Sequence, residues 1–188
     1  SYKSHMLAKY VASTVATKLN SLYGLIEYGK KLGFISSNPL KELDKINIPE
    51  SEIRTFTDAE KDKLLRVVKD DRPGYYIMLL VAFDTAARFN ELTSIVKKSD
   101  FRFEVDAKTK VEFGVMSITN RAVRTKNKRN RYTPIRPATV KILKQYLANF
   151  NDDDLPFEKV DLSKGVFFKQ YLKKAGLDPT YHFHMIRK

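Results

Sequence analysis

The chain has 188 residues, of which 43% are hydrophobic and 12% aromatic, and its 35 lysines and arginines outnumber 22 aspartates and glutamates to give a net charge of +13. A chain of this length buries roughly 70% of the surface that its unfolded form exposes. Its composition excludes a disordered tail. Its lack of cysteine excludes disulfide frameworks, cysteine zinc sites and thiol catalysis. With no apolar run of about 20 residues and no secretory-signal layout in residues 1–6, the sequence predicts a cytoplasmic protein whose positive charge favours nucleic acid as the partner.

The first 33 residues carry apolar side chains at the three-or-four-residue spacing of helices with one buried face. Gly33 and Pro39 end this helical stretch, and residues 41–52, which include Pro49, have the composition of a connector. We therefore expect a helical unit in residues 1–50 and a second domain in residues 51–188.

The second domain is predicted to begin with a helix, because Thr57 and Glu60 have the spacing of a capping box. Residues 71–74 break that helix, and the almost continuously apolar residues 75–83 are typical of a helix buried on most sides. A short helix over about residues 90–96 follows, with Asn90 as its expected N-cap.

After this helix the pattern becomes that of strands. Phe101 and Phe103 alternate with charged residues, and residues 111–119 and 132–135 are further extended candidates. Helical spacing returns at residues 140–147 and 166–172, on either side of an acidic loop. The predicted fold class is therefore mainly α with a small antiparallel sheet (α+β).

The most uneven charge lies around the connection between the second and third strands, where seven basic residues occur without an acidic one. They are Arg121, Arg124, Lys126, Lys128, Arg129, Arg131 and Arg136. Like charges at this density repel one another and gain from a polyanion alongside. The segment predicts contact with nucleic-acid phosphates, although a hairpin tip that is merely solvated would also be basic.

Two further places carry residues suited to phosphate chemistry. Arg88 precedes a helix start, where free amides and the dipole favour an anion, but an ordinary ion pair with Glu91 explains the residue equally well. His184 and Arg187 are three residues apart and would share one helix face, as a proton carrier beside a phosphate clamp. The His-x-x-Arg spacing alone also arises by chance.

Taken in order, these segments resemble the tyrosine recombinases, or phage-type integrases. Residues 85–92, Thr-Ala-Ala-Arg-Phe-Asn-Glu-Leu, resemble the family's Thr-Gly-x-Arg-x-x-Glu-Leu box, and Lys126 followed by Pro134 resembles its lysine turn between two strands. His184 to Arg187 resembles its His-x-x-Arg box, and residues 13–39 are similar to the end of its helical core-binding domain. The resemblance implies a core-binding domain fragment followed by a mixed catalytic domain.

The resemblance further implies a site-specific recombinase or integrase of a phage or other mobile element, which cuts and rejoins DNA through a 3′-phosphotyrosine intermediate. Arg88 and Arg187 would clamp the scissile phosphate, Lys126 would protonate the departing 5′ oxygen, His184 would assist proton transfer, and Glu91 would orient its neighbours. The expected DNA contacts are Lys18, Arg121, Arg124, Lys128, Arg129 and Arg131.

The family implies no metal and no nucleotide cofactor, because the tyrosine ester stores the energy of the phosphodiester. The implied partners are double-stranded DNA and, for the intact protein, three further copies in a synaptic tetramer at the prokaryotic nucleoid.

The sequence departs from the family pattern at several positions. The family's nucleophilic tyrosine follows the His-x-x-Arg box, whereas all ten tyrosines here precede His184, and the nearest, Tyr181, does not match the nucleophile position. We therefore expect this chain to bind DNA without cleaving it. Ala86 replaces a glycine, at a cost of roughly 1–2 kcal/mol if its backbone is left-handed, and Asp100 falls one position later than the family's acidic residue.

Three other interpretations remain open. A regulator derived from an integrase would bind DNA without catalysis. A metal-dependent nuclease or transposase would need clustered acidic ligands, for which residues 152–154 are the candidate, although they also suit a solvated loop. His182 and His184 would form only half of a zinc site.

Overall fold

The computed structural model describes residues 2–44, 46–48, 54–119, 130–160 and 166–187. The chain divides into two compact units, Ser1–Glu52 and Ile53–Lys188. Across the described ranges, none of the helices combines the length and the apolar character needed to span a membrane.

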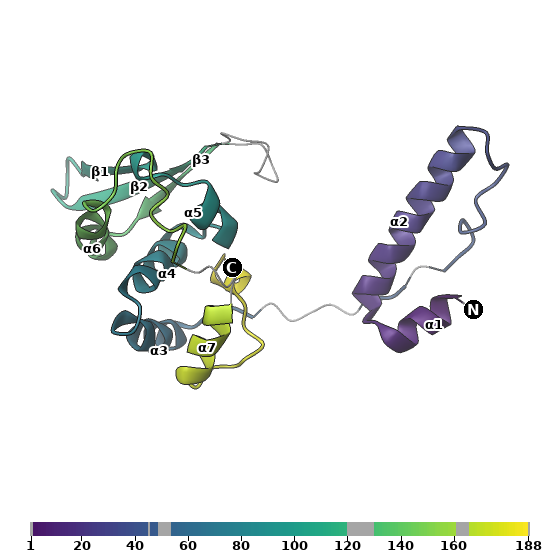
Figure 1. The fold of residues 1–188 in the computed structure, drawn as a ribbon, viewed down its shortest axis with the longest axis horizontal. Helices are drawn as coiled ribbons and strands as arrows, with labels where there is room; N and C mark the ends of the chain where they lie inside the picture. The colour runs from purple at the N-terminus through teal and green to yellow at the C-terminus, as the bar shows by residue number, and fades with distance from the viewer. Residues whose placement is uncertain (1, 45, 49–53, 120–129, 161–165, 188) are drawn as a thin grey trace. The chain divides into compact units, whose positions relative to one another are not determined.

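The first unit consists of helices α1 (Tyr2–Lys9) and α2 (Ala12–Lys31) and the segment that follows them (Figure 1). The left-handed Gly33, with φ of 79°, follows the end of α2, as the sequence predicts. The returning segment is held by the buried side chain of Asn38, which donates to Glu27 of α2 at 2.8 Å and accepts from the amide of Leu40. Among the described residues of this unit, Met6 and Val15 are the buried apolar ones.

In the second unit, α4 (Pro73–Thr85) is the central helix, and it buries most of its circumference, as its apolar sequence predicts. It packs against α3 (Asp58–Lys69), α5 (Phe89–Ser94) and α6 (Pro137–Leu147), and against the 3₁₀ helix η2 (Phe183–Arg187). Helix α7 (Val166–Lys174) lies beside α3, on the side of α4 away from the sheet (Figure 1).

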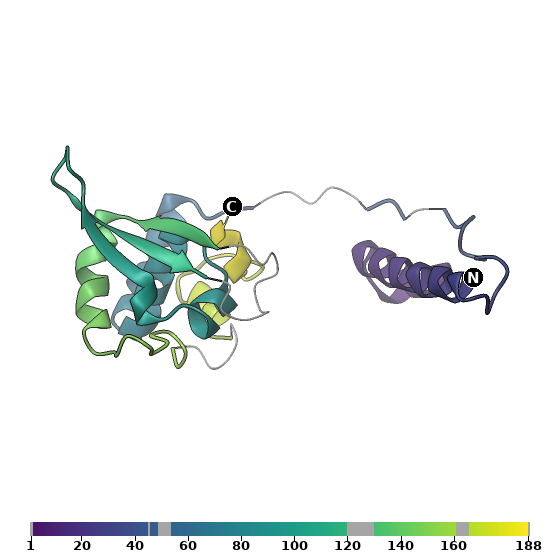
Figure 2. The same cartoon turned by 90° about the horizontal axis from the view of Figure 1, so that it is seen from above.

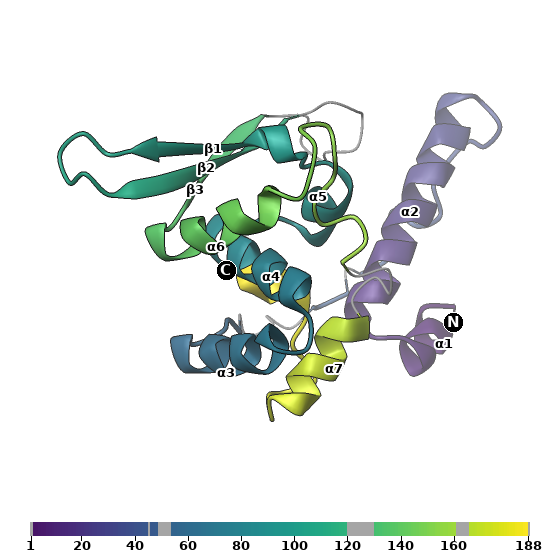
Figure 3. The same ribbon diagram turned by 60° about the vertical axis from the view of Figure 1, so that its left-hand side comes forward.

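The three expected strands form an antiparallel sheet in the order β1 (Phe101–Val105), β2 (Glu112–Ile118) and β3 (Arg131–Ile135), entered from the 3₁₀ helix η1 (Lys98–Asp100). Its inner face packs on α4 and α6, and the β1–β2 hairpin projects from the body of the unit (Figures 2 and 3). The predicted mainly α fold with a small antiparallel sheet is confirmed.

Two local predictions need correction. Arg88, not Asn90, is the N-cap of α5, because the Glu91 carboxylate accepts the Arg88 amide and places the cap two residues earlier. The break before α4 is shorter than expected, since Pro73 is its first residue, where a missing N–H costs nothing. The segment 183–187 is helical, as expected, and takes the 3₁₀ form, in which a three-residue spacing returns to one side of the axis.

Candidate functional site

A tight turn at the end of α4 presents Arg88. The Thr85 hydroxyl donates to the carbonyl of Val81 at 2.7 Å and accepts from the amide of Ala87 at 3.3 Å, in a buried position. Between them Ala86 is left-handed, with φ of 51° and ψ of 32°. The position where the family has glycine therefore requires the conformation that glycine adopts without strain.

Arg88, Glu91 and Arg131 form a charged cluster that joins α5 to the first residue of β3. The Glu91 carboxylate accepts from Nη1 of Arg88 at 2.7 Å through Oε1, and from the Arg88 amide at 2.7 Å through Oε2. Arg131 approaches the same carboxylate with both terminal nitrogens, Nη1 at 3.1 Å from Oε1 and Nη2 at 2.5 Å from Oε2. The sequence suggested the ion pair of Arg88 with Glu91, and the structure adds a second guanidinium, that of Arg131 from the sheet.

The environment of Glu91 keeps it ionised. Its side chain is 4% exposed, and this burial by itself raises the pKa, but hydrogen bonds from the Arg88 amide and from both guanidinium groups outweigh burial, so that the pKa lies below its usual value of 4.5. With two guanidinium groups and one carboxylate, the cluster keeps a net charge of +1 near neutral pH.

Arg88 retains donors for a ligand. Its side chain is 27% exposed, and within the described ranges only its Nη1 meets a side-chain partner, Oε1 of Glu91. The Nε and Nη2 edge of the guanidinium is the fork that binds two oxygens of a carboxylate or phosphate. The cluster is thus built to accept an anion at Arg88.

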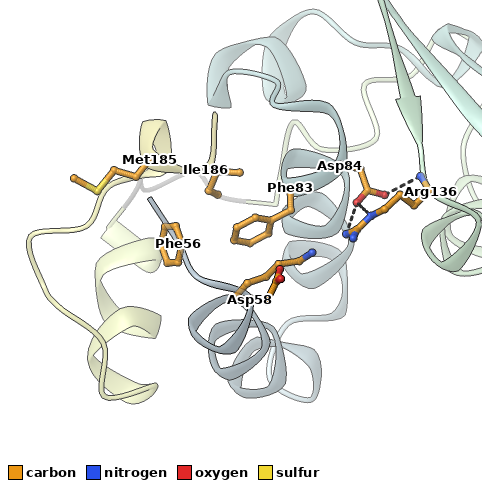
Figure 4. A pocket seen from close by; sticks show the side chains of 8 residues that line it. Phe56, Asp58, Phe83, Asp84, Arg136, Met185 and Ile186 are labelled. Carbon is orange, nitrogen blue, oxygen red and sulfur yellow. Dashed lines mark hydrogen bonds and ion pairs between the residues drawn. The ribbon is translucent and has the colours of Figure 1, made fainter. Parts of the chain in front are cut away.

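The His-x-x-Arg segment lies next to this cluster. Phe183 in η2 packs edge-on against Phe89, which follows Arg88, with ring centroids 5.3 Å apart. Residues Met185 and Ile186 line a cavity of about 320 Å³ together with Phe83 of α4 (Figure 4). The first and third boxes, about a hundred residues apart in sequence, therefore meet on one side of α4, and His184 is exposed there.

The same cavity exposes an ion pair that the sequence analysis missed. The Asp84 side chain is fully buried and accepts from Nε of Arg136 at 2.7 Å and from the Arg136 amide at 3.1 Å, which ties the start of α6 to the end of α4 (Figure 4). A single carboxylate within an apolar helix was the available signal, because a buried charge needs a partner. Arg136, one of the seven basic residues, thus has a structural role.

Part of the predicted site falls outside the residues that the structure describes. Lys126, Arg121, Arg124, Lys128 and Arg129 lie outside the described residues, as does the side chain of Arg187. Lys18, in α2, is exposed and holds its ammonium 4.4 Å from the centre of the Tyr10 ring. Their roles stay predictions.

Tyr181, the tyrosine nearest to the His-x-x-Arg box, is engaged elsewhere. Its side chain is largely buried, and its hydroxyl donates to Oε1 of Glu60 at 2.9 Å, a hydrogen bond that raises the pKa of the phenol. The ring also packs against Phe56, with centroids 4.8 Å apart. The contacts agree with a structural role and give no support to a nucleophile at this position.

The described residues give no support to the alternative metal-site interpretations. No group of three or more metal-ligating side chains occurs in the portion of the chain that the structure describes. Asp152 and Asp153 pair instead with Lys98 at 3.2 Å and Lys97 at 2.6 Å, in the exposed loop that the sequence favoured.

Comparisons with known proteins place this geometry among solved structures. No protein-family model matches the chain, and neither does any curated protein. The Tn1549 transposon integrase in complex with circular intermediate DNA is 16% identical over 99% of this chain and 67% of its own, with a TM-score of 0.69.

Two further structures give similar values. A lambda integrase dimer bound to a COC′ core site is 12% identical over 98% of this chain and 67% of its own, with a TM-score of 0.67. The XerH site-specific recombinase bound to its difH substrate is 17% identical over 99% of this chain and 55% of its own, with a TM-score of 0.68. The chain thus has the fold of the tyrosine recombinases and integrases.

Proposed function

We propose that this chain is the part of a site-specific recombinase that binds DNA and holds the scissile phosphate, and that the recombinase cuts and rejoins DNA strands through a 3′-phosphotyrosine intermediate. The observation that carries the proposal is the Arg88 guanidinium, which is 27% exposed and, among the described residues, meets a side chain only through its Nη1 contact with Glu91, beside the η2 segment that bears His184 and Arg187. The three structures compared above, which share the fold, are integrases and a recombinase bound to DNA.

In the proposed reaction a tyrosine oxygen attacks the phosphorus, and a phosphotyrosine bond forms as the bond to the 5′ oxygen breaks. Arg88 and Arg187 offset the negative charge that develops on the non-bridging oxygens. Lys126 gives a proton to the departing 5′ oxygen, and His184 assists proton transfer. The nucleophilic tyrosine is proposed to lie outside these 188 residues, so the chain by itself binds DNA without cutting it.

A trapping assay tests the proposal. A supercoiled plasmid is incubated in the presence of EDTA with the protein encoded by the full reading frame, and SDS then arrests any covalent protein–DNA adduct. We expect an adduct and relaxed plasmid, because a transient break with free rotation releases supercoils without a metal. The 188-residue chain is expected to bind the plasmid and give no adduct.

Arg88→Lys in the full protein is expected to reduce adduct formation by at least 10²-fold while DNA affinity changes little, because an ammonium cannot replace a planar fork. Arg102→Lys is the matched control, since Arg102 is exposed on β1 without a partner among the described residues. A full protein that binds DNA but never forms an adduct would favour the regulator interpretation, and unchanged cleavage by Arg88→Lys would refute the clamp.

A further inference from the structure

Arg131 was expected to contact DNA, but its guanidinium points into the protein. It opens β3, where its backbone pairs with Ile118 of β2, so its position is set by the sheet ladder. Both of its terminal nitrogens lie against Glu91, and its side chain is 32% exposed. An arginine whose fork already holds a carboxylate in this way has its best donors occupied.

The contact changes what Glu91 offers to Arg88. Arg131 lies at both carboxylate oxygens, so that Arg88 makes one side-chain hydrogen bond, through Nη1, in addition to its amide contact. A carboxylate three residues from an arginine and free of a second partner tends toward the bidentate arrangement, with two parallel N–H to oxygen bonds. Such a pair would occupy and neutralise the fork that a phosphate needs.

We propose that Arg131 is a positioning residue: by sharing the Glu91 carboxylate it limits that carboxylate to one donor of the Arg88 side chain and keeps the rest of the Arg88 fork open to a phosphate oxygen pair. This role rests on the proposed function, since the phosphate is that of the DNA strand. It replaces a DNA-backbone contact for Arg131, and it links Arg88 to the strand that follows the segment containing Lys126.

The first test measures adduct formation by the full protein. Arg131→Ala is expected to reduce it roughly 10²-fold, the size of effect produced by a misplaced catalytic group. Arg102→Ala, which removes an exposed arginine from the neighbouring strand, is expected to leave it unchanged. Because Arg131 acts through Glu91, Arg131→Ala is expected to reduce adduct formation much less in a Glu91→Gln background than in the wild-type background.

The second test measures binding of a random-sequence duplex by the 188-residue chain as salt is raised. A phosphate contact contributes about 0.9 to the slope of log affinity against log salt. Arg131→Ala is expected to keep the wild-type slope, and a slope reduced by about 0.9 would overturn the proposal. Carbon-13 NMR titration of the Glu91 carboxyl supplies an independent readout: its pKa is expected to rise in Arg131→Ala and to stay in place in Arg102→Ala.

Arg131→Lys guards against a variant that fails to fold, because it keeps the charge in the strand but replaces the fork by a single ammonium. It is expected to fold, as judged by its amide spectrum, and to lose at least tenfold in adduct formation. The two proposals fail differently. If the wild-type full protein forms no adduct, the proposed function is refuted. If the wild-type protein forms an adduct, and Arg131→Ala and Arg131→Lys form it in the same yield as the wild type, only the positioning role is refuted.

Discussion

At the scale of single residues, Ala86 is one of two non-glycine residues with a positive φ in the part of the chain that the structure describes, the other being Lys110. Its left-handed conformation ends α4 and turns the chain toward Arg88. An alanine in this region is roughly 1–2 kcal/mol less favourable than in a right-handed one. The turn survives because the buried Thr85 hydrogen bonds fix both sides of it.

Ala86→Gly is therefore expected to stabilise the protein. Glycine relieves the left-handed strain but adds about 0.4–1 kcal/mol of unfolded-state entropy, so the net gain is roughly 0.5–1 kcal/mol. Urea denaturation of the 188-residue chain measures it. Ala87→Gly is the matched control, since Ala87 is fully buried and has a negative φ, and it is expected to destabilise by about 1 kcal/mol. Equal losses in both variants would contradict the strain argument.

Glu91 makes the stability of the second unit depend on pH. Burial raises its pKa and the hydrogen bonds from Arg88 and Arg131 lower it further than burial raises it, so the folded-state pKa lies below 4.5. A carboxyl with a depressed pKa stabilises the fold above its unfolded value, and this contribution is lost as pH falls from about 4.5 through the folded pKa.

Glu91→Gln is expected to reduce stability by about 2 kcal/mol near neutral pH, less than for a fully buried pair because both guanidinium groups are partly exposed. It is also expected to flatten the loss of stability between pH 6 and pH 3. Urea titrations across that range provide the measurement. Glu104→Gln, at an exposed glutamate of β1 without a partner in the described residues, is expected to follow the wild-type curve. Parallel curves for Glu91→Gln and wild type would contradict the argument.

At the scale of elements, the N-terminus of α3 connects distant parts of the second unit. Thr57 and Glu60 form the reciprocal capping box that their spacing predicts, with the Glu60 amide 3.3 Å from the Thr57 hydroxyl and the Thr57 amide 2.9 Å from the Glu60 carboxylate. The same carboxylate accepts from Tyr181, in the loop before η2. The cap of α3 thereby helps to hold the segment that carries His184.

Thr57→Ala is expected to destabilise the second unit by about 1 kcal/mol, because it leaves an amide of the first turn without its acceptor. Thermal or urea unfolding measures the change. Asp62→Ala, on the exposed face of the same helix, is the control and is expected to change stability by less than about 0.5 kcal/mol. If the two variants are equally stable, the capping box contributes nothing.

The sequence predicted those elements whose signals are local. Helix periodicity, the capping box and the alternation in the strands are each formed by residues close together in sequence. The structure contains each of these features. The contacts of Glu91 with Arg131 and of Asp84 with Arg136 span 40 and 52 residues. Nothing in the spacing of charges selects one partner among 35 basic residues, so these pairs needed the folded chain.

The N-cap of α5 illustrates the same limit at short range. Asparagine is the better intrinsic cap, which favoured Asn90, but the Glu91 carboxylate accepts the Arg88 amide and fixes the N-cap two residues earlier. The side-chain acceptor that decides the boundary is itself held by Arg131 from another element. Tertiary contacts here override the local preference.

For the whole molecule, charge is distributed unevenly between the two units. Residues 1–52 hold seven basic against five acidic residues, a net charge of +2, whereas residues 53–188 hold 28 against 17, a net charge of +11. Electrostatic attraction to a polyanion is therefore expected to come mainly from the second unit. Part of its positive charge is already paired, as in the contact of Lys174 with Asp71 at 2.8 Å.

The salt dependence of duplex binding by the intact 188-residue chain tests which of these charges contact DNA. Its affinity is expected to fall linearly on logarithmic axes between 50 and 200 mM salt, with Arg129→Ala and Lys18→Ala each reducing the slope by about 0.9. Lys174→Ala, at a lysine paired within the protein, is expected to leave the slope unchanged, because no condensed counterion is released there. Since phosphate contacts act regardless of base sequence, Arg129→Ala and Lys18→Ala are expected to lose the same affinity on duplexes of unrelated sequence. A Lys174→Ala effect as large as that of Arg129→Ala would mean that net charge, and not particular contacts, governs binding.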